Sequence, residues 1–187
     1  MKTINLNNLK LELSLKAKNG IDFIFSAGII WIAITIIWML SYTSYNKSIF
    51  TFMIGGILLP LAFLLSKILK TQWKVKHNPL QPLGLWLNFA QLFYFPFLIF
   101  ILIANPDYFV MTYAIITGAH LFPYAWFYNQ KSYAVFAGLI SVGSMLISIN
   151  IDKENMFYVP LYTSICLILL GVCLFIFYKR KSKLSLK

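Results

Sequence analysis

Six apolar blocks, each about twenty residues long, follow one another along the chain. A block of this length matches the roughly 20 residues that cross a ~30 Å hydrocarbon layer as an α-helix. Turn-forming residues separate the blocks, for example Asn105, Pro106 and Asp107 between the third and the fourth. The pattern predicts an all-α, polytopic membrane protein, a bundle of six transmembrane helices. The predicted spans are residues 21–40, 49–69, 84–104, 108–128, 133–151 and 156–178.

The first twenty residues are too polar for a span or for a signal-peptide core. Leu6, Leu9 and Leu13 share one stripe of a helix, whereas Leu9 to Leu15 also alternate with polar residues as in a strand. We expect a cationic amphipathic helix on the cytoplasmic face of the membrane, and a strand or a partner-docking segment is the alternative. The expected organisation is a cytoplasmic amphipathic segment at 1–20, a six-helix transmembrane domain at 21–178 and a basic cytoplasmic tail at 179–187.

The amino-acid composition agrees with a membrane protein, and it bears on what the high net positive charge indicates. Of 187 residues, 60% are hydrophobic and only 11% are charged, whereas soluble domains carry about 25% charged residues. The net charge of +11 could indicate nucleic acid binding. All but one of the basic residues are lysine, the exception being Arg180, and nucleic-acid modules favour the bidentate arginine side chain. We therefore predict no nucleic acid partner.

The positions of the basic residues predict the orientation. Fourteen of the 16 Lys and Arg residues fall in the N-terminal segment, in the second and fourth connections, or after the last span. Only Lys47 and Lys153 fall in the other connections. The positive-inside rule then predicts a multi-pass protein of the cell (cytoplasmic) membrane with both termini in the cytoplasm. Anionic lipids of the cytoplasmic leaflet should attract each surface lysine by about 1 kcal/mol.

Polar residues at membrane depth are informative because they are costly to place in hydrocarbon. His120 lies in the fourth predicted span, about 18 Å from its outer end and about 12 Å from its inner end. The short connection around Pro106 predicts that the third and fourth spans form an antiparallel hairpin. Mirroring the chain about Pro106 sets residue 92 opposite residue 120. This register brings Asn88 and Gln91 to the depth of His120.

These residues form the candidate site. Thr117, His120 and Tyr124 follow one stripe of the fourth span, and Asn88 and Gln91 share one face of the third. We predict a pocket between spans three and four that binds or transports a small solute or a lipid, lined by Asn88, Gln91, Thr117, His120 and Tyr124. The alternative is a hydrogen-bonded network that only holds neighbouring helices together.

Two other function classes stay open. A membrane-embedded lipid-modifying enzyme could use His120 as its acid or base. However, the chain has no paired carboxylates at membrane depth, no metal-ligand spacing and no phosphate-binding glycine loop, so we favour a non-enzyme without metal or cofactor. The third possibility is a ligand-free accessory subunit of an oligomer or membrane complex. It would pack through a stripe of small residues on the fifth span, namely Ala137, Ser141, Ser144 and Ser148.

Three further features carry structural predictions. Asp22 opens the first span, where a helix N-terminus stabilises an acid. Gly55, Gly56 and Pro60 predict a kink or a close approach in the second span. Aromatic residues near the inner ends of the spans, namely Trp73, Trp86, Trp126 and Tyr128, are expected to anchor the protein at the membrane interface.

Three stretches carry a resemblance to a known family. They are KAKNGIDFIFSAGIIWIAI entering the first span, NPLQPLG before the third, and GAHLFPYAWFYNQKSY through the end of the fourth. Together they resemble an uncharacterised family, a domain of unknown function, of small bacterial multi-pass membrane proteins. The run Gly118-Ala119-His120 with Pro123 is the most specific part. The resemblance implies a multi-pass membrane architecture and implies no activity.

Overall fold

The computed structural model describes residues 5–185, so the first four residues of the predicted amphipathic segment and the last two of the predicted basic tail lie outside it. The described residues form an all-α protein, as predicted. The helices are α1 (Leu6–Lys16), α2 (Ile21–Met39), α3 (Ser44–Gly55), α4 (Leu58–Leu69), α5 (Gln81–Leu92), α6 (Phe95–Ala104), α7 (Phe109–Phe127), α8 (Ser132–Ile149) and α9 (Tyr158–Ser185). Short 3₁₀ turns, η1 (Lys18–Gly20), η2 (Pro106–Tyr108) and η3 (Lys153–Asn155), connect some of them.

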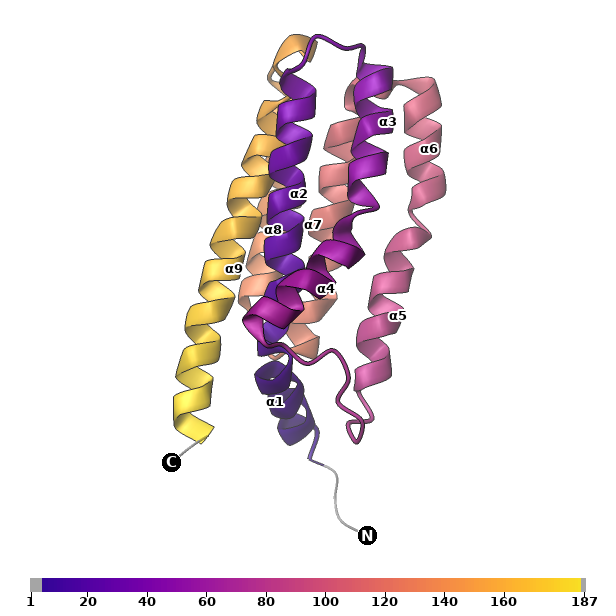
Figure 1. Cartoon of the computed structure of the whole chain (residues 1–187). Coiled ribbons are helices and arrows are strands. Elements are labelled where there is room, and N and C mark those ends of the chain that lie inside the picture. The colour runs from indigo at the N-terminus through magenta and orange to yellow at the C-terminus, as the bar shows by residue number, and fades with distance from the viewer. Residues whose placement is uncertain (1–4, 186–187) are drawn as a thin grey trace.

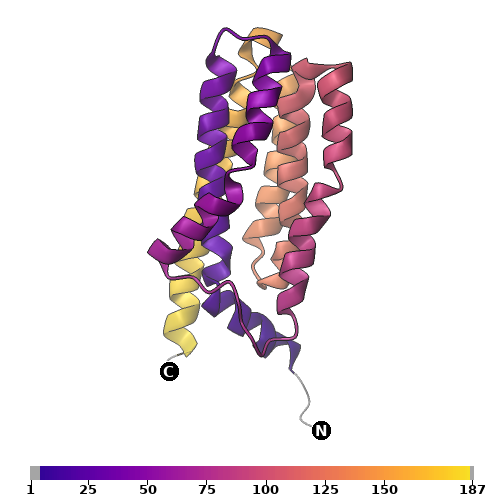
Figure 2. The same ribbon diagram turned by 45° about the vertical axis from the view of Figure 1, so that its right-hand side comes forward.

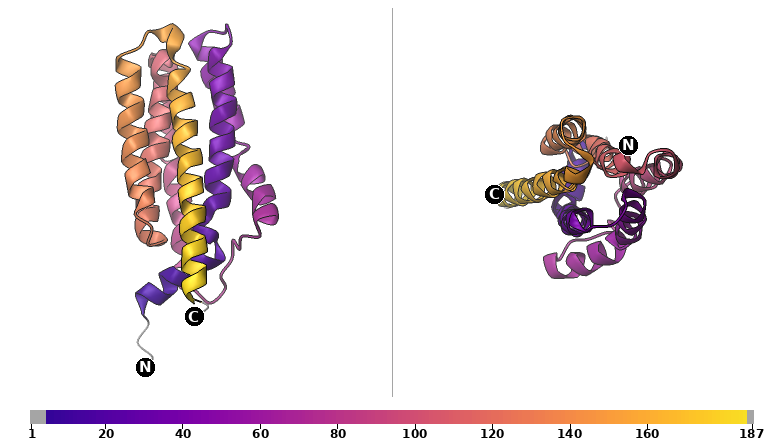
Figure 3. Two further views of the ribbon diagram at one scale, coloured as in Figure 1. Left: turned by 90° about the vertical axis from the view of Figure 1, so that its left-hand side faces the viewer. Right: turned by 90° about the horizontal axis from the view of Figure 1, so that it is seen from above.

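The helices from α2 to α9 run side by side along one long axis, and the chain reverses direction at each connection except the breaks within the α3–α4 and α5–α6 pairs (Figure 1). The helix α1 lies obliquely beneath one end of this bundle (Figure 3, left). The α4–α5 connection, the α7–α8 connection and the end of α9 lie at the same end (Figures 1 and 2). We call it the basic end, because the described lysine and arginine residues other than Lys47 and Lys153 lie in these three segments, in α1 and η1, or in the last turn of α4.

Four helical stretches of the described residues are long and apolar enough to cross a membrane, and the α3–α4 pair, bent by 40°, would make a fifth. The four are Lys18–Met39, Gln81–Ala104, Ser132–Ile149 and Lys153–Lys183. The predicted fourth span corresponds to α7, which has 19 residues but is not among them. Six membrane spans therefore do not follow from length and composition of the helices alone.

The position of α7 explains its lower apolar content. Ten of its 19 residues are buried, including Thr112, Thr117 and Tyr124. Its contact with α8 is the most extensive helix pair of the bundle, and it also packs against α3, α5, α6 and α9. A helix enclosed by other helices does not need a purely apolar surface, because its neighbours shield it from the surroundings.

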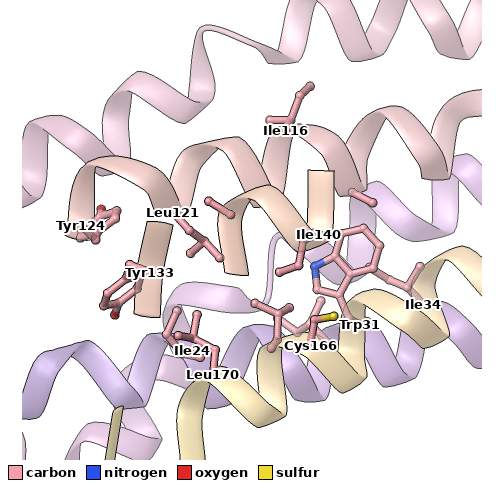
Figure 4. Close-up of a cluster of buried hydrophobic side chains, with 14 of the residues drawn as sticks. Ile24, Trp31, Ile34, Ile116, Leu121, Tyr124, Tyr133, Ile140, Cys166 and Leu170 are labelled. Atoms are coloured by element: carbon pink, nitrogen blue, oxygen red, sulfur yellow. The ribbon is translucent and has the colours of Figure 1, made fainter. Parts of the chain in front are cut away.

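The core lies where α2, α7, α8 and α9 meet. Trp31 of α2, Ile140 of α8 and Cys166 of α9 lie next to one another there and are buried (Figure 4). The pair α2–α9 is second only to α7–α8 in the extent of its contact. Of the α2 span, 61% of the positions are buried, against only 6% of the α5–α6 span. The α5–α6 pair is therefore a peripheral element attached to a tightly packed centre.

Two of the predicted spans are interrupted. The second breaks between α3 and α4 at Gly56 and Ile57, which confirms the kink that the glycine pair predicts. The third was expected as one helix over 84–104, but it breaks at Phe93 and Tyr94. Pro96 in the first turn of α6 explains this break, because proline lacks an N–H donor and its ring excludes the preceding helical turn.

The helix α1 confirms the expectation that the N-terminal segment is a helix and not a strand. It packs against the bundle itself: the Asn78 side chain donates to the Leu9 carbonyl at 2.9 Å, and the Gln72 amide donates to the Lys16 carbonyl at 3.0 Å. The Lys10 ammonium lies 3.4 Å from the centroid of the Trp126 ring, a cation–π contact. These contacts fasten α1 to the α4–α5 connection and to α7.

Candidate functional site

His120 and Tyr124 form the centre of the candidate site on α7. Their rings lie 5.4 Å apart in an edge-to-face arrangement, as expected for residues four positions apart on a helix. Tyr124 is only 8% exposed, and His120 is half-buried. The structure gives the His120 side chain no hydrogen-bond partner among the described residues. The imidazole therefore keeps its hydrogen-bonding capacity for another group.

The hydroxyl of Tyr124 is the one buried side-chain polar atom in the described part of the chain that has no hydrogen-bond partner. Buried polar groups in proteins are almost always paired, and an unpaired one calls for a specific reason, such as an absent ligand or water. Leaving a hydroxyl unpaired away from water costs about 1–3 kcal/mol. An acceptor placed at Tyr124 would recover this free energy.

Two of the other predicted residues bond to their own helices. Thr117 donates from its hydroxyl to the Tyr113 carbonyl at 2.9 Å. Asn88 donates from its side-chain amide to the Gly84 carbonyl at 3.1 Å. The described structure contains no hydrogen bond from either side chain to His120 or Tyr124. A ligand that engages Thr117 or Asn88 would have to share or displace these local bonds.

The side chain of Gln91 has no hydrogen-bond partner among the described residues, and the residue is half-buried on α5. The register of the hairpin can be followed about two helical turns closer to the basic end, where Gly84 lies against Phe127. A Cβ on Gly84 would lie 2.9 Å from the Phe127 ring. Mirroring the chain about Pro106 predicts that residue 84 lies opposite residue 128. The observed contact, Phe127, is one position away from this prediction. Counting along both helices from this contact sets Gln91 near the depth of His120.

A cluster of stacked tyrosines links the site to the basic end. The ring of Tyr124 lies 6.1 Å from that of Tyr128 and 5.8 Å from that of Tyr133. Tyr124 and Tyr133 come from α7 and α8 and lie next to each other in Figure 4. Tyr128 is buried within this cluster, so its expected role as an interfacial anchor is wrong. Its ring packs between other aromatic rings, whereas Trp86 and Trp126 are exposed.

Asn19 is a buried residue that the sequence analysis did not single out. It is fully buried with a left-handed backbone, φ +58°. Its side-chain amide donates to the Leu174 carbonyl at 3.1 Å, and its side-chain oxygen accepts from Ser14. Its own carbonyl accepts from the Tyr133 hydroxyl at 2.7 Å. Asn19 thus joins α1, α8 and α9; the Asn-Gly pair before the first span was the available signal.

Asp22 has partners beyond the helix N-terminus that the sequence indicated. Its carboxylate oxygen Oδ2 accepts from the Thr71 hydroxyl and from the Trp73 indole, each at 2.7 Å. The residue is buried, and no ion pair of the described residues includes it. The Trp73 ring also stacks on Phe23, with centroids 4.9 Å apart. These contacts fix the α4–α5 connection to the start of α2, a link between distant residues that the sequence pattern does not reveal.

Comparison with known proteins adds one finding. A family model described as a family of unknown function (DUF7010) matches residues 6–177. The chain belongs to this family. The match begins with α1 and ends within α9, so it covers the helices of the bundle that surround His120. No curated protein and no solved structure matches the chain. The family assignment supports the expected uncharacterised family and supplies no activity.

The stripe of small residues on α8 is covered within the chain. Ser141 donates to the Ile115 carbonyl of α7 at 3.2 Å. The Ser144 hydroxyl lies 3.3 Å from that of Thr163 on α9. Ser148 donates to the sulfur of Met156 at 3.4 Å. Because the stripe packs against α7 and α9, it does not offer the free surface that an accessory subunit would need there.

Proposed function

We propose that the protein is an integral membrane protein with six spans: α2, the α3–α4 pair, the α5–α6 pair, α7, α8 and α9. The long apolar helices and the exposure of large apolar side chains, such as Phe93, Phe100 and Ile103 on the α5–α6 pair, support this proposal. Apolar side chains of this size gain free energy when hydrocarbon replaces water around them. The spans α7 and α3–α4 are included because they run alongside the others.

The distribution of charge supports an orientation with the basic end in the cytoplasm of a bacterial cell. Acidic residues Asp107, Asp152 and Glu154 lie in the connections at the other end. The positive-inside rule then gives cytoplasmic termini, with the lysines of the basic end facing anionic lipids.

Reporter fusions test this topology. An alkaline phosphatase fusion that ends at Asp152 should be active, since that enzyme folds outside the cytoplasm, and fusions that end at Lys76 or Lys187 should be inactive. Green fluorescent protein at the same three positions serves as the reciprocal control and should fluoresce only at Lys76 and Lys187. The reverse pattern at any of the three positions would contradict the proposed orientation.

We further propose that the bundle binds or transports a small, uncharged or aromatic solute, or a lipid, at His120, Tyr124 and Gln91. The unpaired hydroxyl of Tyr124 is the observation that carries this proposal. A phenol hydroxyl donates, so the ligand must offer an acceptor oxygen or nitrogen. The surrounding tyrosine rings favour a flat or apolar body. Entry is expected beside the peripheral α5–α6 pair, the least buried of the candidate spans.

Native mass spectrometry of the purified protein tests the ligand site. The wild type should retain a co-purified small molecule or lipid, and Tyr124→Phe should lose about 80% or more of it, since the loss of one hydrogen bond of about 1–1.5 kcal/mol weakens binding roughly 5- to 10-fold. Tyr162→Phe is the matched control, because the hydroxyl of Tyr162 donates to the Leu139 carbonyl at 2.9 Å. It should retain the ligand.

The stability of Tyr124→Phe separates loss of ligand from loss of fold. Without ligand, the variant should unfold at the same or a higher temperature than the wild type, since the substitution removes an unpaired buried hydroxyl. Equal ligand retention by the wild type and by Tyr124→Phe, in a protein of unchanged stability, would overturn the proposed site.

A further inference from the structure

A cavity of about 520 Å³ opens at the end of the bundle opposite the basic end. It lies where the end of α2, the connection after it, the first turn of α3 and the segment between α8 and α9 come together. Its size falls within the range of small-molecule sites in proteins. Unlike the apolar groove between α8 and α9 at Ile147 and Leu161, this cavity is lined by a cation and an anion, Lys47 and Glu154.

Lys47 is held in a fixed position at the wall of the cavity. Its ammonium donates to the Trp38 carbonyl at 3.0 Å and lies 5.8 Å from the centroid of the Trp38 ring. An ammonium group has three N–H donors. One of them is used in this bond, which orients the charge and leaves donors for an anionic group in the cavity.

Glu154 is the acidic side chain that lines the same cavity. Its neighbour Lys153 is already paired, because its ammonium lies 2.5 Å from the Asp107 carboxylate. That hydrogen bond lowers the pKa of Asp107. Neither Glu154 nor Lys47 belongs to an ion pair of the described residues. The two charges of the cavity are therefore of opposite sign, separate from each other and not neutralised by a neighbouring ion.

Aromatic side chains complete the wall. Trp38, Tyr42 and Phe157 line the cavity together with the two charges. The indole of Trp38 donates to the Thr51 hydroxyl at 3.0 Å, which fixes the ring. Aromatic faces attract ammonium groups, and a carboxylate beside them adds to this attraction.

We propose that this cavity binds a zwitterion of the phosphoethanolamine type, with its phosphate on Lys47 and its ammonium on Glu154. The ligand could be the headgroup of a phospholipid or a free small molecule of the same chemistry. The lipid source rests on the proposed membrane embedding, since the cavity would then lie at the depth of the headgroups of the outer leaflet. Binding of the free small molecule does not depend on that embedding.

Two thermal-unfolding experiments test the proposal. In detergent, the protein is titrated with O-phosphoethanolamine, with inorganic phosphate and with ethanolamine. In nanodiscs, phosphatidylglycerol alone is compared with a mixture that contains phosphatidylethanolamine. We expect the melting temperature Tm to rise with the zwitterion and to rise less with either half of it at the same concentration, because the stabilisation by a ligand increases with the ratio of its concentration to its Kd. A rise in Tm in detergent would show that the free zwitterion binds without a lipid. A rise in Tm only in nanodiscs would show that the ligand is the lipid headgroup.

The variants Glu154→Gln and Lys47→Gln each remove one charge of the cavity. Each should weaken zwitterion binding about tenfold or more, the effect of losing a charge-assisted hydrogen bond. Asp152→Asn is the matched control, since it removes an exposed acid of the same connection that does not line the cavity. Full binding by Glu154→Gln, an equal response to phosphate alone, or no response in both media would overturn the proposal. A positive titration in detergent would stand even if the reporter fusions contradicted the proposed topology.

Discussion

Replacing Gly118 by alanine is expected to lower the free energy of unfolding by about 1–3 kcal/mol, the usual cost of overpacking a filled interior. Gly118 lies on α7 where that helix packs against Ile140 and Ser141 of α8. A Cβ at this position would lie 2.5 Å from the Ser141 hydroxyl and 2.9 Å from the Ser141 backbone nitrogen. The hydroxyl can rotate away, but the backbone cannot. The two helices would have to separate along the most extensive contact of the bundle.

Unfolding in mixed micelles of mild detergent and sodium dodecyl sulfate measures this effect. Gly138→Ala on α8 is the matched control, because a Cβ there meets no atom within 4 Å. It should stabilise the protein by about 0.5–1 kcal/mol, the gain in helix propensity from glycine to alanine. Stabilisation of both variants would show that α7 and α8 are not in close contact at Gly118.

The second large effect is expected at Asn19, where substitution by alanine should destabilise the protein by about 2–4 kcal/mol. The change removes the hydrogen bonds of Asn19 with the Leu174 carbonyl and the Ser14 hydroxyl, and each lost hydrogen bond costs about 0.5–1.5 kcal/mol. Asparagine and alanine both carry a Cβ in this left-handed backbone at φ +58°, but the short polar side chain of asparagine makes the conformation less costly. The substitution therefore adds about 1 kcal/mol of backbone strain.

Two further substitutions separate the hydrogen bonds of Asn19 from its backbone strain. Asn19→Gly loses the same bonds but tolerates the left-handed backbone, so it should be about 1 kcal/mol more stable than Asn19→Ala. Asn129→Ala places alanine in a left-handed position, φ +48°, where the side chain is exposed. It should cost only about 1 kcal/mol. If Asn129→Ala cost as much as Asn19→Ala, backbone strain alone would explain both, and the buried network would carry no stability.

Several structural features were predictable because they depend on residues close together in the sequence. The Gly55-Gly56 pair predicts the break between α3 and α4, since two residues without a Cβ favour a kink. The hairpin register near Gly84 and Phe127 follows from the short connection at Pro106, which leaves few ways to pair the two helices. Pro96 likewise indicates a break in the helix from local sequence alone. The break was not predicted, because the apolar residues continue without interruption on both sides of this proline.

The candidate site was predictable in part. The contact of His120 with Tyr124 follows from helical spacing. The orientation of Thr117 and Asn88 toward their own backbones does not, because a short polar side chain can bond locally or across helices with little difference in free energy. The absence of a partner for the Tyr124 hydroxyl also depends on all the neighbours of that atom, which come from several helices.

The sequence by itself determined the helical class, the apolar lengths, the kink at Gly55 and the segregation of lysines into alternate connections, since each depends on a local pattern or on composition. The tertiary structure alone decided which helix is central and which polar residues meet. It placed the less apolar α7 at the centre and the strongly apolar α5–α6 pair at the edge. It also joined Asp22 to Thr71 and Trp73, about fifty residues away. Such contacts arise from the packing of whole helices. They cannot be predicted from a local pattern, because an apolar stripe indicates that one face of a helix is buried but not which helix packs against it.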